Sequence, residues 1–185
     1  MTKNTWIVVL LGFGLLGLIL LEGYIKPEIG YITPDLRQEQ DPLTHDLSSV
    51  VGFRSRYMGN APNLANLNGR LPLNHIPRTL QLHPEDLTAE INYQESVSGI
   101  ESEMLRRSLV YNATANFALI ENLELLIFNF EDRSFTITRT AVESWYEGDL
   151  TSLLSEERWN SGVQLRLSDR AYVDRFFEAS FVIGP

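Results

Sequence analysis

The feature that most constrains this chain is an apolar stretch near its N-terminus, which begins at Trp6, ends at Leu21 and contains no charged side chain. About 16 helical residues at ~1.5 Å each reach about 24 Å, and the flanking positions up to residue 25 extend this length toward the ~30 Å of a bilayer core. Trp6 and Tyr24 stand at its two ends, as aromatic side chains do at membrane interfaces. The stretch therefore predicts a single transmembrane helix, which anchors residues 1–25 in the lipid bilayer.

A cleaved signal peptide and a lipoprotein signal are the two alternatives to an uncleaved signal anchor. A cleavage site needs small residues, whereas large apolar residues and Glu22 close this stretch, and a lipoprotein signal needs a cysteine, which the chain lacks. Lys3 precedes the stretch while Lys26 and Arg37 follow it, so the charge difference across it is small. The export-like layout favours a single-pass bacterial membrane protein whose domain lies outside the cytoplasm. A membrane-tethered scaffold that faces the cytosol is the alternative.

Charge and proline spacing divide the rest of the chain. The formal net charge is −9, which argues against nucleic acid as a partner because phosphates require clusters of Lys and Arg. Residues 26–47 contain Pro27, Pro34 and Pro42 among many charged residues, a composition that predicts an extended linker with His45 exposed. Residues 48–185 are long enough for one domain with its own core.

The domain shows alternating helical and strand patterns. Pro62 opens a short helix with Asn60 as its cap, and residues 79–83 and 87–94 read as two strands around a turn. Residues 124–130 and 134–140 read as a second hairpin, and helical segments follow to the C-terminus. This order predicts an α+β domain with one antiparallel sheet of about four strands and helices on one face.

The strongest helical pattern in the domain follows the first strand pair. Spacings of three and four residues place five apolar side chains on one helix face: Leu105, Leu109, Ala113, Phe117 and Ile120. This helix is apolar on much of its circumference, so we expect it to lie at the centre of the core.

The sequence contains no catalytic, metal or cofactor motif. His83 with Glu85 and Asp86 could approach a metal ion, but their spacing matches no metal signature, and His75 stands alone. Adjacent carboxylates do not by themselves create the two different environments that acid–base catalysis requires. We therefore predict no catalytic residue, no metal site and no cofactor, and we expect no enzyme. An envelope-acting hydrolase, whose cleft would surround His75, His83 or Arg56, is the alternative.

One segment of the acidic domain gathers positive charge. Arg54 and Arg56 stand beside Tyr57 just before Gly59 and Asn60. Arginine offers rigid donors to a carboxylate or phosphate and tyrosine offers a flat contact surface, so Arg54, Arg56, Tyr57 and Asn60 are the predicted binding residues. The structural alternative is a turn into the first helix, with Tyr57 packed inward.

Ordered pieces of the sequence resemble a bacterial family of domains of unknown function. RYMGN at residues 56–60 and LPL at residues 71–73 resemble its Y-V-G-[DN]-N … L-P-L opening. Residues 80–93 resemble its strand pair, and NATANFALIENLELLIF at residues 112–128 resembles its helix-to-strand segment. Thr138 and Arg139 begin a stretch to Leu150 that resembles its T-R-x-x-a-x-x-x-Y-G-x-D-L motif.

The resemblance implies an exported domain behind a lipobox or a single membrane span. Such domains are also attached to BlaR-type sensor metallopeptidases and to anti-sigma-factor-like membrane proteins. This implies a role in sensing or in binding a membrane sensor, protease or regulator. No catalytic residue is carried over, and this chain has an apolar span where relatives have a lipobox cysteine. The sequence thus predicts a membrane-anchored, extracytoplasmic interaction or sensing module.

Overall fold

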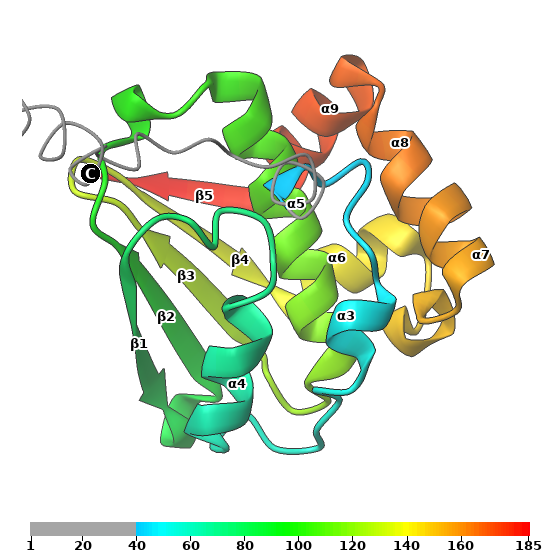
Figure 1. Cartoon of the computed structure of the whole chain (residues 1–185), viewed down its shortest axis with the longest axis horizontal. Coiled ribbons are helices and arrows are strands. Elements are labelled where there is room, and N and C mark those ends of the chain that lie inside the picture. The colour runs from blue at the N-terminus through cyan, green and yellow to red at the C-terminus, as the bar shows by residue number, and fades with distance from the viewer. Residues whose placement is uncertain (1–39) are drawn as a thin grey trace, which may run out of the picture. The chain divides into compact units, whose positions relative to one another are not determined.

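The computed structural model describes residues 40–185, which form an α+β domain with a five-stranded sheet in the order β1-β2-β3-β4-β5 (Figure 1). The strands are β1 (Arg78–His83), β2 (Thr88–Tyr93), β3 (Leu125–Asn129), β4 (Ser134–Thr138) and β5 (Phe181–Gly184). Neighbouring strands are antiparallel except for β2 and β3, which run parallel. The sheet is therefore mixed.

The helices of the described residues lie in the connections between strands and at both ends of the domain. They are α3 (Ser48–Val51), α4 (Ala61–Asn68), α5 (Ser102–Leu119), α6 (Arg139–Tyr146), α7 (Glu156–Trp159), α8 (Leu165–Leu167) and α9 (Arg170–Ser180). Four shorter helical segments complete them: η1 (Pro84–Asp86), η2 (Val97–Gly99), η3 (Leu150–Leu153) and the π-helical turn η4 (Asn160–Gln164).

The central helix α5 is the one that the apolar spacing predicts. It is 18 residues long, and its side chains are buried from Ser108 to its last residue. The Glu101 carboxylate accepts hydrogen bonds from the backbone N–H groups of Glu103 and Met104, which starts the helix by satisfying two of its free donors. Because α5 connects β2 to β3 over one face of the sheet, the chain returns to the same end and the two strands become parallel.

The two faces of the sheet differ in polarity. The face covered by helices carries buried residues such as Ile91, Phe128 and Phe135. On the other face the Asn129 side chain donates to Asn92 at 2.7 Å and to Glu90 at 3.3 Å. This alternation, apolar toward the helices and polar away from them, is the pattern expected of a sheet with one covered face.

Helix α4 begins and ends as its sequence predicts. The Asn60 side chain accepts a hydrogen bond from the Asn63 backbone N–H, Pro62 lies in the first turn, and Gly69 follows the last residue. Pro62 lacks the N–H that a helix interior requires and is therefore tolerated at this end.

The predicted fold class needs two corrections. The sheet has five strands rather than about four, because β5 follows α9 directly with no turn residue to announce it. It is mixed rather than antiparallel, because α5 is a long crossover and not a tight turn. The predicted transmembrane helix at residues 6–21 lies outside the described residues. Within residues 40–185, no helix combines the length and the apolarity that a bilayer crossing requires.

Candidate functional site

Three of the four predicted binding residues lie together on an exposed loop between α3 and α4. Arg54 and Arg56 expose 52% and 79% of their side chains, and Tyr57 is 68% exposed. We call these three residues the Arg–Tyr patch. The exposure of Tyr57 shows that the alternative with Tyr57 packed inward is wrong. Its neighbour Met58 is the buried residue of this loop.

The loop that carries the Arg–Tyr patch is fixed to the end of α5 through its backbone. The Ser55 N–H donates to the Leu119 carbonyl at 2.9 Å, and the Glu121 N–H donates to the Ser55 carbonyl at 2.9 Å. Further along, the Met58 N–H donates to the Asn122 side-chain oxygen at 2.6 Å. These contacts hold the loop on both sides of Arg56, so its exposed side chains project from a fixed base.

One carboxylate lies beside both arginines of the Arg–Tyr patch. Glu121 Oε1 lies 3.2 Å from Arg54 Nη2, and its Oε2 lies 3.6 Å from Arg56 Nε. Two guanidinium groups share this single carboxylate, so the patch keeps a net positive charge. Exposed ion pairs of this kind contribute about 0–1 kcal/mol, which leaves both arginines available to an external carboxylate.

The fourth predicted binding residue, Asn60, has a structural role. Its side-chain oxygen accepts from the Asn63 N–H at 3.3 Å as the cap of α4. The structure thus brings Arg54, Arg56 and Tyr57 together and directs the side-chain oxygen of Asn60 into the helix.

A pocket of about 360 Å³ lies between α4 and β1, and we call it the α4–β1 pocket. His75 lies in its lining, and its Nδ1 donates to the Gln40 side-chain oxygen at 2.8 Å. Partial desolvation and then the positive charge of Arg78 lower the pKa of His75. The full lining is Ala65, Asn68, Asn74, His75, Ile76, Pro77, Arg78, Thr79, Leu80 and Ile91.

The other two histidines have partners within the domain. His83 Nε2 lies 2.9 Å from Glu90 Oε1 across the β1–β2 hairpin, so the structure pairs His83 with Glu90 and not with Glu85 or Asp86. Across residues 40–185, no three side chains from His, Asp and Glu are grouped as a metal site requires.

His45 belongs to a buried polar network that the sequence does not reveal. Its Nε2 lies 2.8 Å from the Arg70 carbonyl and must donate to it, so Nδ1 accepts from the Tyr111 hydroxyl at 2.8 Å. The Tyr111 oxygen accepts in turn from Trp159 Nε1 at 3.0 Å. The Gln164 side chain donates to the carbonyls of Pro42 and His45. The expectation that His45 is exposed is therefore wrong, because this part of the predicted linker packs onto the domain.

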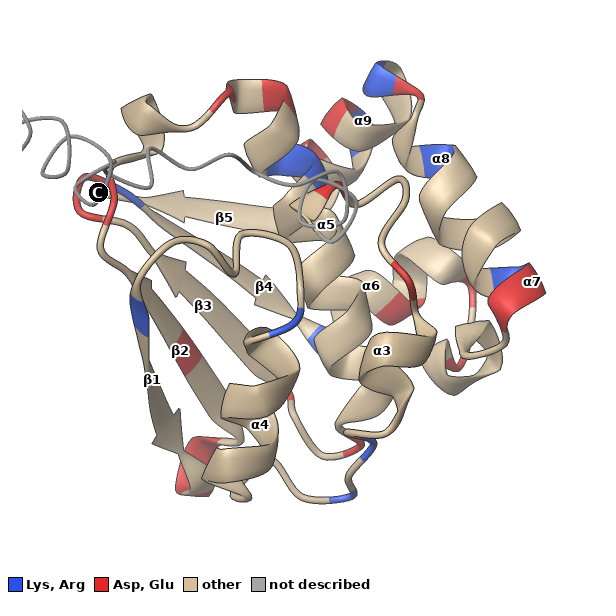
Figure 2. Ribbon diagram, in the orientation of Figure 1, with Lys and Arg blue, Asp and Glu red and all other residues tan. Residues whose placement is uncertain are grey.

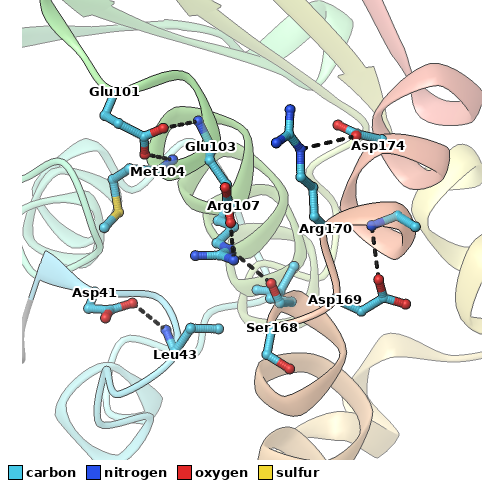
Figure 3. Close-up of polar contacts among 12 residues, drawn as sticks. Asp41, Leu43, Glu101, Glu103, Met104, Arg107, Ser168, Asp169, Arg170 and Asp174 are labelled. Carbon is cyan, nitrogen blue, oxygen red and sulfur yellow. Dashed lines mark hydrogen bonds and ion pairs between the residues drawn. The ribbon is translucent and has the colours of Figure 1, made fainter.

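A second cluster of charge joins α5 to α9 (Figure 3). The Arg107 side chain contacts the Glu103 carboxylate and donates through Nε to the Leu167 carbonyl at 2.9 Å. Arg106 Nη1 of α5 lies 3.0 Å from Asp174 Oδ1 of α9, and Arg170 lies 3.8 Å from the same carboxylate. The Arg106–Asp174 pair crosses the helix junction, which indicates a structural role.

Two of the family-like motif residues, Asn112 and Arg139, bind backbone carbonyls of other segments of the domain. The Asn112 side chain donates to the Pro72 carbonyl at 2.8 Å, which joins the helix motif to the LPL segment. Arg139 donates to the carbonyls of Phe117, Ile120 and Leu123 around the end of α5. These motifs therefore maintain the fold around the loop of the Arg–Tyr patch.

The geometry defines an α+β domain in which Asn112 and Arg139 hold segments together and in which the candidate binding residues Arg54, Arg56 and Tyr57 lie on a fixed, exposed loop. Residues 50–140 match the family model described as a domain of unknown function, DUF4825. No curated protein matches the chain, and no solved structure matches it. The segment that matches this model runs from the end of α3 to the start of α6 and is followed by the C-terminal helices and β5.

Proposed function

We propose that this protein is an interaction or sensing module that acts at a membrane, outside the cytoplasm, and binds a protein partner through the Arg–Tyr patch. The observation that supports this proposal is the exposure of Arg54, Arg56 and Tyr57 on a loop whose backbone is fixed on both sides. A fixed loop loses little conformational entropy when a partner binds, so more of the contact energy contributes to affinity.

The chemistry of the Arg–Tyr patch favours an acidic protein surface as its partner. Arginine and tyrosine are enriched among the residues that contribute most to protein–protein affinity. The patch is positive although the chain carries a net charge of −9. A carboxylate of the partner can compete with Glu121 for either guanidinium, while Tyr57 supplies apolar contact area.

Two sequence features support the proposed location and partner class. The apolar residues 6–21 favour attachment to a membrane, and the charge-rich segment that follows favours a domain held away from it. The family resemblance indicates a membrane sensor, protease or regulator as the partner. Neither the membrane location nor the partner class is inferred from the Arg–Tyr patch. If either is wrong, the patch can still be the binding site.

The hydrolase alternative gains one observation, the α4–β1 pocket beside His75. The lining of this pocket contains no Asp or Glu that could orient His75, and the hydroxyl group in the lining is that of Thr79. The pocket is therefore better suited to binding than to hydrolysis.

The proposal is tested by crosslinking in cells that express the full-length chain, followed by purification and identification of the captured proteins. The test variant combines Arg54→Ala, Arg56→Ala and Tyr57→Ala. A matched control combines Arg133→Ala, Arg175→Ala and Leu165→Ala, which removes the same charge and one large exposed side chain elsewhere on the surface. Residues 1–47 alone serve as the control for proteins captured by the N-terminal segment.

We expect the patch variant to lose most of a specific membrane-protein partner while its thermal melting temperature stays unchanged. The matched control should capture as much partner as the unmodified chain. Equal capture by both variants would exclude the Arg–Tyr patch as the contact. Capture by residues 1–47 alone would assign the interaction to the N-terminal segment instead.

A further inference from the structure

The α4–β1 pocket is lined by both apolar and polar residues. The apolar ones are Ala65, Ile76, Pro77, Leu80 and Ile91, and the polar groups come from the end of α4, the following loop and the start of β1. Its volume of about 360 Å³ has room for about a dozen non-hydrogen atoms at ~30 Å³ each. A pocket of this size and mixed lining is typical of sites for small ligands or for a terminal residue of a peptide.

The positive charge in this pocket belongs to Arg78, which is half-buried at the start of β1. Figure 2 shows in blue where Lys and Arg occur along the ribbon. Its guanidinium donates to three backbone carbonyls: to Asn68 at 2.6 Å, to Asn74 at 3.0 Å and to Ile76 at 3.1 Å. These bonds fix the group in place, but the carbonyls are neutral. None of the ion pairs formed within residues 40–185 involves Arg78. The charge is thus positioned without being neutralised.

The guanidinium also keeps unused donors. Arginine has five N–H groups, and the three carbonyls of the described residues use two on Nη1 and one on Nη2. One N–H on Nε and one on Nη2 remain, and two donors on one guanidinium suit the two oxygens of a carboxylate. Asn74, whose Oδ1 accepts from Gln40, retains its amide hydrogens at the same pocket.

We propose that the α4–β1 pocket binds a carboxylate that carries a small apolar group, with Arg78 as the residue that holds the anion. The carboxylate neutralises the fixed positive charge, and the apolar group covers the apolar lining residues Ile76, Leu80 and Ile91. The site shares no residue with the Arg–Tyr patch, so this inference goes beyond the proposed function and does not depend on it. The carboxylate can come from a free organic acid or from the C-terminus of a peptide.

The test is calorimetric titration of the purified full-length chain with two matched probes, 3-phenylpropanoate and 3-phenylpropanamide. They have nearly the same shape, but the amide carries no charge. Two further probes, N-acetyl-Ala-Ala-Phe with a free and with an amidated C-terminus, distinguish a free acid from a peptide end. We expect each acid to bind at least about tenfold more tightly than its amide, because the charged oxygens form the stronger hydrogen bonds. Preference for the peptide acid over 3-phenylpropanoate identifies a peptide C-terminus as the source.

Two variants separate the site from general loss of structure. Arg78→Gln removes the charge and should weaken 3-phenylpropanoate binding about tenfold or more, but it also removes bonds to three carbonyls. Ala65→Phe fills the pocket from an exposed position of α4, and Asn66→Phe adds the same ring to the neighbouring exposed position outside the lining. We expect Ala65→Phe to abolish binding and Asn66→Phe to leave it unchanged, with melting temperatures within a few degrees of each other.

The proposal is overturned by either of two results. If acid and amide bind equally, or neither binds, Arg78 does not recruit an anion. If Ala65→Phe and Asn66→Phe bind 3-phenylpropanoate equally well, the ligand occupies another place. Loss of binding in Ala65→Phe together with an intact Arg–Tyr patch would also show that the two sites act separately.

Discussion

Tyr111 joins three distant parts of the domain through one hydroxyl group. Its oxygen accepts from Trp159 near the C-terminal helices, and its hydrogen is donated to His45 near the N-terminal end of the described residues. Burial raises the pKa of Tyr111, which keeps the hydroxyl protonated and able to donate. A single phenol thus links the chain before α3 to α5 and to α7.

Replacement of this hydroxyl should destabilise the domain although the ring is kept. In Tyr111→Phe, the Trp159 N–H and the His45 Nδ1 lose their hydrogen bonds to this hydroxyl in a buried environment, at a cost of roughly 1–3 kcal/mol. The measurement is the free energy of unfolding from denaturant titration. Tyr57→Phe removes an exposed hydroxyl and should leave that free energy unchanged, so equal stability of the two variants would contradict the network.

At the scale of elements, several helical segments have an exposed carboxylate near their start that accepts a backbone N–H group. Hydrogen bonds from Ser48, from Glu103 and from Val97 lower the pKa values of Asp46, Glu101 and Asp132. Hydrogen bonds from the Thr151 hydroxyl and backbone N–H lower the pKa of Asp149 in the same way. These four groups place negative charge at the positive ends of helical segments.

These caps predict a loss of stability in acid. A carboxylate whose pKa is lowered by folding stabilises the domain above its ordinary pKa, 3.8 for Asp and 4.5 for Glu, and loses this contribution as the pH falls through its value in the folded protein. The melting temperature should therefore fall as the pH drops below about 4.5. Asp149→Asn keeps the accepting oxygen but cannot titrate, so its melting temperature should depend less on pH in this range. Glu178→Gln, an exposed change outside the caps, should follow the unmodified chain, and an identical pH dependence of all three proteins would contradict the role of the caps.

Elements with a strong local pattern could be predicted from the sequence, whereas distant pairing could not. The spacing of Leu105, Leu109 and Phe117 indicates α5 because one helix face needs only local periodicity. β5 has only four residues and follows α9 with no turn before it, so nothing local separates it from the helix. The burial of His45 depends on Tyr111, which lies 66 residues away in the chain.

The sequence also does not indicate which side chains in the loop of the Arg–Tyr patch face outward. The loop has no period, so nothing local indicates that Met58 is buried while Tyr57 is exposed. That choice is made by the Met58 backbone bond to Asn122. The chemistry of Arg54, Arg56 and Tyr57 identifies them as candidate binding residues from the sequence alone. Only the structure shows that Asn60 has a different role, as the cap of α4.

At the scale of the whole molecule, the described domain offers surfaces of different character. The open face of the sheet carries a polar cluster, in which the Asn129 side chain donates to Glu90 and to Asn92. The Arg–Tyr patch is exposed and positive, and the α4–β1 pocket is concave with a fixed guanidinium. A module with a surface for a protein and a pocket for a small anion can bind both at once, because the two share no residue.

The side of the membrane that this domain faces can be measured in intact cells. A protease added to cells that express the full-length chain with a C-terminal tag should remove the tag, because we predict that the domain lies outside the cytoplasm. A tagged cytosolic protein should stay intact in the same cells and be degraded only after lysis. Full protection of the tag would assign the domain to the cytosol and support the scaffold alternative.

The backbone pairing of Ser55 with the residues around Ile120 has a consequence for how such domains diverge. Main-chain groups are the same in every residue except proline, so they hold this loop whichever side chains it carries. Positions 54, 56 and 57 can therefore accept new side chains while the loop keeps its path. Evolution can change the specificity of this surface without redesigning its support, as antibodies vary loops on a constant frame.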